Sequence, residues 1–113
     1  MTIDELKTYG ADTAEGLQRC MNKESFYLRL VKMIPGDANF PKLYDAIDKG
    51  DLKAAFEAAH ALKGSTGNLS LTPLFASASE LCELLRAGTQ ADHAALIAKI
   101  RAARDELARI CES

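Results

Sequence analysis

Three pairs of residues at predicted helix boundaries constrain the fold of this chain more than any other feature. They are Gly50-Asp51, Thr72-Pro73 and Gly88-Thr89. Glycine commonly ends helices, aspartate and threonine cap the first turn of a new helix, and proline is favoured at the first helical position. Each connection is therefore only two or three residues long, and helices joined by such short loops pack antiparallel. The spacing predicts an up-down helical bundle.

Apolar residues recur three and four positions apart in the segments between these pairs. This period places them on one face of a helix, and the alternation typical of strands is absent. The predicted helices run from Asn39 to Lys49, Leu52 to Leu69, Pro73 to Ala87 and Gln90 to Cys111. Their predicted core seams are Leu43 and Ile47; Ala55, Ala59, Leu62, Thr66 and Leu69; Leu74, Ala78, Leu81 and Leu85; and Leu96, Ile100, Ala103, Leu107 and Ile110.

Shorter helices are expected before the bundle. Thr2 with Glu5 forms a capping-box pattern for a first helix that ends near Gly10, and Asp12 with Glu15 opens a second one. A third apolar segment, 26–34, ends at the Pro-Gly-Asp sequence of residues 35–37. The sequence therefore predicts one all-α domain over residues 1–113: an antiparallel up-down four-helix bundle at 39–111, with short N-terminal helices at 2–34 packed against it.

Composition and charge narrow the class of protein. The chain has 113 residues, of which 48% are hydrophobic, and a domain of this size hides roughly two-thirds of its unfolded surface on folding. Fourteen Lys and Arg are interspersed with sixteen Asp and Glu, so no basic field favours nucleic acid or anionic lipid. No apolar run approaches the roughly 20 residues of a membrane helix, and no basic and apolar leader follows Met1. We expect a free-standing, monomeric, cytoplasmic protein with neither nucleic acid nor membrane as its partner.

The three cysteines predict no metal or disulfide site. Cys20, Cys82 and Cys111 are far apart, odd in number and lack the Cys-x-x-Cys spacing of metal and redox sites. Each falls where a helical pattern would bury it at least in part. We interpret them as reduced thiols that serve as small apolar side chains.

His60 lies on the solvent flank of the predicted helix 52–69. At about 100° per residue, it is turned roughly 130° away from the core seam of that helix. The same flank carries Lys53, Phe56, Glu57, Lys63, Gly64 and Gly67. The opposite side carries the small residues Ala54, Ala58, Ala61 and Ser65, which permit a close neighbouring helix.

An exposed imidazole with these neighbours is suited to carrying a phosphoryl group. Imidazole has an ordinary pKa of about 6.5, so its neutral, nucleophilic form is available in the cell. Lys63, one turn away, places an ammonium beside the transferred group. The attraction between two unit charges 4 Å apart is about 4 kcal/mol at an effective dielectric of 20 but about 1 kcal/mol in water. Lys63 should therefore tune a transfer rather than carry it. A glycine at position 64 destabilises the helix by about 1 kcal/mol relative to alanine, and such a cost is explained if the backbone of another protein must come close to His60. Gly67, one turn further on, suggests the same close approach.

The sequence His60-x-x-Lys63-Gly64 resembles the phosphoacceptor helix of histidine-containing phosphotransfer (HPt) domains. The resemblance is good over about residues 38–88 and looser over the rest. It implies a four-helix bundle whose His60 accepts a phosphoryl group and passes it to or from the aspartate of a response-regulator receiver domain, with a sensor or hybrid histidine kinase as a further partner. The chain would then be a phosphocarrier and not an enzyme, with no metal or cofactor of its own and Mg²⁺ only on the receiver.

The same resemblance implies which residues contact the partner. The expected contacts are Lys53, Phe56, Glu57, Gly64, Gly67 and Asn68. The chain departs from the family pattern at Ser70, where many members have glycine, and in lacking a glutamine on the next helix to hold the imidazole. Either Ser79 or Cys82 could face the ring instead.

Other interpretations have less support in the sequence. Glu57 and His60 match the Glu-x-x-His of di-iron bundles, but such sites need a second copy, and Gln90 stands three residues before His93. We interpret His93 as a surface residue. A helical adaptor that binds through Phe56 and the small-residue surface would tolerate replacement of His60. The phosphoacceptor domain of a chemotaxis-type kinase shares the bundle and a similar histidine motif.

Nucleotide chemistry is not indicated. The sequence contains no Walker-type glycine loop, no kinase nucleotide box and no Gly-x-Ser-x-Gly elbow. The chain is therefore expected to receive phosphate from another protein and not from ATP.

Overall fold

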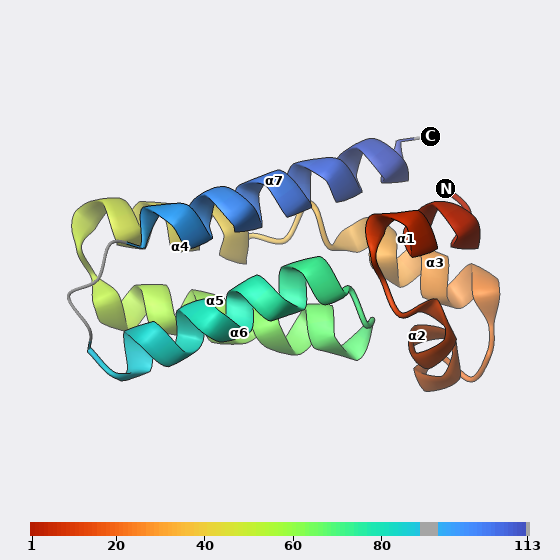
Figure 1. Cartoon of the computed structure of the whole chain (residues 1–113), viewed down its shortest axis with the longest axis horizontal. Helices are drawn as coiled ribbons and strands as arrows, with labels where there is room; N and C mark the ends of the chain where they lie inside the picture. Colours follow the sequence, from red (N-terminus) through yellow and green to blue (C-terminus); the bar gives the residue numbers. More distant parts are fainter. Residues whose placement is uncertain (89–92, 113) are drawn as a thin grey trace.

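The computed structural model describes residues 1–88 and 93–112. These residues form helices and no strand, which confirms the predicted all-α class (Figure 1). The helices are α1 (Ile3–Tyr9), α2 (Thr13–Arg19), α3 (Glu24–Met33), α4 (Asn39–Lys49), α5 (Leu52–Asn68), α6 (Thr72–Arg86) and α7 (Ala94–Cys111).

Helices α4 to α7 form the antiparallel bundle. Helix α5 packs against both α4 and α6, and α6 packs against α7. Figure 1 shows α5 and α6 running together along the long axis beside α4 and α7. The predicted seams point inward, with Leu62, Leu81 and Leu107 all but fully buried, whereas Ile47 and Ala103 are only half-buried. The core is thus the one expected from the three- and four-residue spacing.

The N-terminal helices cover one end of this bundle. Figure 1 shows α1, α2 and α3 gathered at the end where α5 turns into α6 and where both chain termini lie. Helix α1 packs against α7, and the Tyr9 hydroxyl donates a hydrogen bond to the Ala103 carbonyl at 2.9 Å. The prediction that short N-terminal helices pack against the bundle is confirmed.

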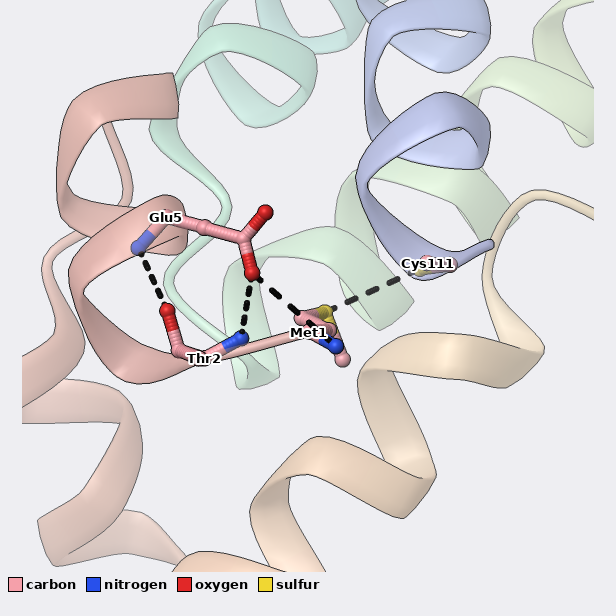
Figure 2. A network of polar contacts seen from close by, with 4 residues as sticks. All are labelled: Met1, Thr2, Glu5 and Cys111. Atoms are coloured by element: carbon pink, nitrogen blue, oxygen red, sulfur yellow. Dashed lines mark hydrogen bonds and ion pairs between the residues drawn. The ribbon is translucent and has the colours of Figure 1, made fainter. Parts of the chain in front are cut away.

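A polar network at the start of α1 ties the two ends of the chain together (Figure 2). The Glu5 amide donates to Thr2 Oγ1 at 3.1 Å and the Thr2 amide donates to Glu5 Oε1 at 2.9 Å, which is the predicted capping box. The amino group of Met1 lies 3.9 Å from the same Glu5 oxygen. The Met1 sulfur is 3.8 Å from Cys111 Sγ at the end of α7. The cap therefore also positions the N-terminus against α7.

The connection between α4 and α5 follows the sequence signals. Gly50 adopts a left-handed φ of +71°, and the Asp51 carboxylate accepts a hydrogen bond from the Ala54 amide at 3.1 Å. Gly88 is also left-handed, with φ of +66°. The predicted cap Thr89 and the predicted helix start Gln90 lie outside the described residues, and α7 begins at Ala94.

The predicted cap at Thr72 is wrong. Helix α6 already includes Thr72, its N-cap residue is Leu71, and no side chain caps it. The reason is packing. Leu71 is fully buried and its amide donates a hydrogen bond to the Thr66 carbonyl at 2.9 Å, so burial of Leu71 makes the helix begin one residue earlier than predicted. Pro73 keeps its expected place in the first turn, where its missing N–H costs nothing.

The interpretation of His93 as a surface residue is also wrong. His93 is only 9% exposed and precedes Leu96 by three residues and Ile100 by seven, so it continues the buried seam of α7. It lies beside Ile47 and Asp48 at the end of α4. Its Nε2 has no hydrogen-bond partner within the described part of the chain.

The cysteines are free thiols, as predicted. Cys20 and Cys82 are buried and Cys111 is half-buried. Burial raises the pKa of the Cys82 and Cys111 thiols, which keeps both protonated near neutral pH. Among the described helices, none is long and apolar enough to cross a membrane.

Candidate functional site

His60 points toward solvent because other faces of helix α5 pack into the core. Ala55, Ala59 and Leu62 are buried, and the buried Thr66 hydroxyl donates to the Leu62 carbonyl at 2.7 Å within the helix. His60 is exposed, as the helical geometry predicted.

A hollow of about 480 Å³ lies beside the His60 ring. Four of the residues that the sequence placed with His60 line it from the same helix. These are Lys63, Gly64, Gly67 and Asn68. The structure thus brings the predicted nucleophile, its lysine and both glycines together on one concave surface.

The other three predicted contacts lie outside the hollow. Phe56 stacks on His60, with ring centroids 5.7 Å apart and planes inclined by 20°. Lys53 is exposed nearer the start of the helix. Glu57 is exposed and lines a separate depression toward α4.

The imidazole is held by an aromatic contact and not by either candidate from the next helix. Ser79 Oγ is buried and has no hydrogen-bond partner in the described residues, so it does not bond to the ring. Cys82 is fully buried, and no hydrogen bond joins it to His60. Phe56 provides the ring contact, and the Arg86 guanidinium carbon lies 5.7 Å from the Phe56 ring centroid.

The two glycines serve different purposes. A β-carbon at Gly64 would meet no other atom within 4 Å, so this surface is open to an incoming chain. A β-carbon at Gly67 would approach the Phe75 ring to 2.9 Å. The expectation that Gly67 leaves room for another backbone is therefore corrected: the α6 side chain Phe75, which is 37% exposed, fills that space and lines the rim of the hollow.

Half of the hollow comes from residues that the sequence did not indicate. Besides Phe75, they belong to α2 and its N-cap, to the turn between α5 and α6, and to the first position of α6. They are Asp12, Glu15, Arg19, Ser70 and Thr72. Helical periodicity carries no signal for them, because they reach the site only through the packing of α2 across that turn.

The turn holds α2 through Ser70. Ser70 adopts a left-handed φ of +55°, a conformation that favours glycine, which explains why glycine suits this position. Its carbonyl accepts from the Asp12 amide and its hydroxyl donates to Glu15 Oε1, both at 3.0 Å. Arg19 Nη2 lies 3.0 Å from the same Glu15 oxygen.

The di-iron interpretation gains no support. Among residues 1–88 and 93–112, no three or more His, Cys, Asp or Glu side chains come together as a group able to hold a metal ion. Glu57 faces a depression lined by α4 residues, not a bundle interior.

Comparison with known proteins identifies the family. The model of the Hpt domain family matches residues 36–112, which span α4 to α7 and more than half of the chain. The comparisons with curated proteins and with solved structures gave no match. Hpt domains are phosphocarriers, not enzymes, and they exchange phosphoryl groups on histidine with kinases and receiver domains in phosphorelays. With its all-helical bundle, its exposed histidine and this match, the chain belongs to the Hpt domain family.

Proposed function

We propose that His60 is the phosphoacceptor, and that it exchanges a phosphoryl group with the aspartate of a response-regulator receiver domain. The observation that carries this proposal is the contrast between the two histidines. His60 is exposed beside a hollow that also contains Lys63, whereas His93 is buried at the start of α7.

The transfer step needs only an exposed imidazole from this chain. One ring nitrogen of His60 attacks the phosphorus, a nitrogen–phosphorus bond forms, and the bond from phosphorus to the aspartate oxygen breaks. The aspartate leaves as a carboxylate with the electron pair, and the second ring nitrogen keeps its proton. Mg²⁺ and carboxylates on the receiver provide the remaining charge neutralisation, so this chain contributes no metal or other cofactor.

The neighbours of His60 have supporting roles. Lys63 is half-buried one turn along α5 and lines the hollow, where its ammonium stabilises the transferred phosphoryl group. Gly64 leaves an open surface for the receiver. The other proposed receiver contacts are Lys53, Phe56, Glu57, Gly67 and Asn68.

The chain acts as a monomeric cytoplasmic relay between a sensor or hybrid histidine kinase and a receiver. The sequence contains no nucleotide motif of its own, so a partner protein provides the phosphate. The bundle presents His60 on an outward face that a receiver domain can reach.

The test is the transfer of labelled phosphate from a phosphorylated receiver. Wild-type chain should become labelled, and the label should be lost in acid and kept in alkali, as expected for phosphohistidine. His60→Gln should abolish labelling. His93→Gln serves as the matched control, since it removes the only other histidine and should leave labelling intact in the folded fraction measured by circular dichroism. Labelling of His60→Gln at the wild-type rate would exclude His60 as the phosphoacceptor, whereas absence of label in the wild type would favour an adaptor.

A further inference from the structure

Helix α2 forms a second wall of the hollow beside His60. Asp12, Glu15 and Arg19 line the same hollow as His60 and Lys63, although roughly 40 to 50 residues separate the two groups along the chain. The family match begins at residue 36, so α2 lies outside it. This wall is therefore a property of this chain beyond the matched bundle.

Two anchors fix α2 against the end of α5. Gly16 admits the ring of Tyr27, since a β-carbon at Gly16 would lie 2.6 Å from a ring atom. The Tyr27 hydroxyl donates to the Leu69 carbonyl at 2.8 Å, and the Asp12 amide donates to the Ser70 carbonyl at 3.0 Å. Both anchors end on the turn that follows α5, so the position of α2 is set relative to His60.

Two consecutive polar contacts position the Arg19 side chain. Ser70 Oγ donates to Glu15 Oε1 at 3.0 Å, and Arg19 Nη2 pairs with that oxygen at 3.0 Å. The Arg19 side chain stays 52% exposed. A guanidinium has five donors in a rigid fork, so one ion pair to Glu15 restrains it and leaves other donors for a second carboxylate.

The hollow thus carries a cation from each of two helices, Lys63 on α5 and Arg19 on α2, and His60 lines the same hollow. A receiver that brings its phosphoaspartate to His60 also brings the carboxylates that surround that aspartate. Such carboxylates can pair with the Lys63 ammonium and with the exposed part of the Arg19 guanidinium. Asp12 and Glu15 on the same wall offset the charge of Arg19, so the pairing with the receiver is local and uses the guanidinium donors that Glu15 leaves free.

We propose that α2 is a second docking surface for the receiver domain, on which Arg19, positioned by Glu15 and Ser70, pairs with an acidic residue beside the phosphoaspartate. The proposal rests on the proposed function of His60. It makes Arg19 a determinant of receiver affinity and choice, not a group that touches the reacting atoms.

The experiment separates docking from chemistry. Transfer from a phosphorylated receiver is measured for Arg19→Ala and Arg19→Glu, and labelling by phosphoramidate, a small donor that needs no docking, is measured in parallel. The apparent KM, defined as the concentration of phosphorylated receiver that gives the half-maximal rate of single-turnover transfer, should rise about threefold for Arg19→Ala and about tenfold for Arg19→Glu, with the maximal transfer rate nearly unchanged. Phosphoramidate labelling should stay at the wild-type rate. The rise in KM should shrink in high salt, because the Debye length falls from about 10 Å at 0.1 M to about 3 Å at 1 M.

Arg109→Glu is the matched control. Arg109 is also an exposed arginine paired with a glutamate of its own helix, Glu106, but it lies on α7 away from the hollow, and its reversal should leave KM unchanged. An unchanged KM in both Arg19 variants, with normal wild-type transfer, would overturn the role of α2 and leave His60 as the phosphoacceptor. Absence of label in the wild type would instead remove the proposed function itself.

Discussion

The ring of Phe56 stacks on the imidazole of His60, with centroids 5.7 Å apart and planes inclined by only 20°. The two residues are one helical turn apart on α5, so the helix itself brings the rings together. Because no hydrogen bond to His60 comes from Ser79 or Cys82, this stacking is the contact that limits the orientation of the ring.

Replacing Phe56 by leucine should slow phosphorylation of His60. The variant keeps an apolar side chain but loses the stacked ring, and aromatic pairs contribute about 0.5–1.5 kcal/mol, which corresponds to roughly a two- to twelvefold lower rate. Labelling by phosphoramidate measures this effect without receiver docking. Phe26→Leu is the control, since Phe26 is also half-buried with an arginine over its ring. Equal rates for both variants would show that the stacking does not position His60.

Lys63→Ala should lower the rate of transfer from the receiver about five- to tenfold without abolishing it. The ammonium lies one turn from His60 on a half-buried side chain, where a charge interaction is worth about 1 kcal/mol or somewhat more. Lys63→Arg retains the charge and should recover most of the rate. Lys99→Ala, at an exposed position on α7, controls for the loss of one positive charge. Complete loss of transfer in Lys63→Ala would mean that the lysine is indispensable, contrary to its proposed tuning role.

Gly64 should tolerate alanine but not a large side chain. Gly64→Ala adds a β-carbon that meets no other atom within 4 Å, so the free energy of unfolding should rise by about 0.5–1 kcal/mol. Gly64→Trp should weaken receiver binding about tenfold or more, because the ring would occupy the surface left open for the partner. Denaturant unfolding and binding titration measure the two effects.

Gly67 is the internal comparison for Gly64. Gly67→Ala should lower the free energy of unfolding, since its β-carbon would force the Phe75 ring to shift from 2.9 Å. If the two alanine variants had the same free energy of unfolding, the inference that Gly64 is open and Gly67 is packed against Phe75 would be wrong.

Tyr27 should make the stability of the protein depend on pH in alkali. Burial, with smaller contributions from Cys20 and Asp12, raises the pKa of Tyr27 from 10.0 to about 12. Between pH 10 and 12 the unfolded chain loses a phenol proton that the folded chain retains, so the free energy of unfolding falls as the pH rises. The stabilisation is complete below pH 10 and is lost through pH 12.

Tyr27→Phe provides the measurement. It should be less stable than the wild type at pH 7 by about 1–3 kcal/mol, because the Leu69 carbonyl loses its buried donor. Its free energy of unfolding should also fall less steeply between pH 10 and 12, as measured by denaturant unfolding followed by circular dichroism. Parallel curves for the two proteins would show that Tyr27 does not titrate with a raised pKa.

Local signals along the chain were sufficient for the bundle and for the placement of His60. Helix α4 begins and ends where predicted, and α5 ends one residue before its predicted end, because caps and left-handed glycines act over a single turn. The outward direction of His60 follows from the apolar seam of its own helix. Periodicity within one helix needs no knowledge of its neighbours.

Packing between distant segments decided the rest. The Thr72 cap was lost because Leu71 enters the core, and His93 is buried because it continues the seam of α7. Arg19 reaches the hollow beside His60 only because Tyr27 and Ser70 hold α2 across the end of α5. No helical period links residues so far apart in sequence, so the second wall of the site exists only in the assembled tertiary structure.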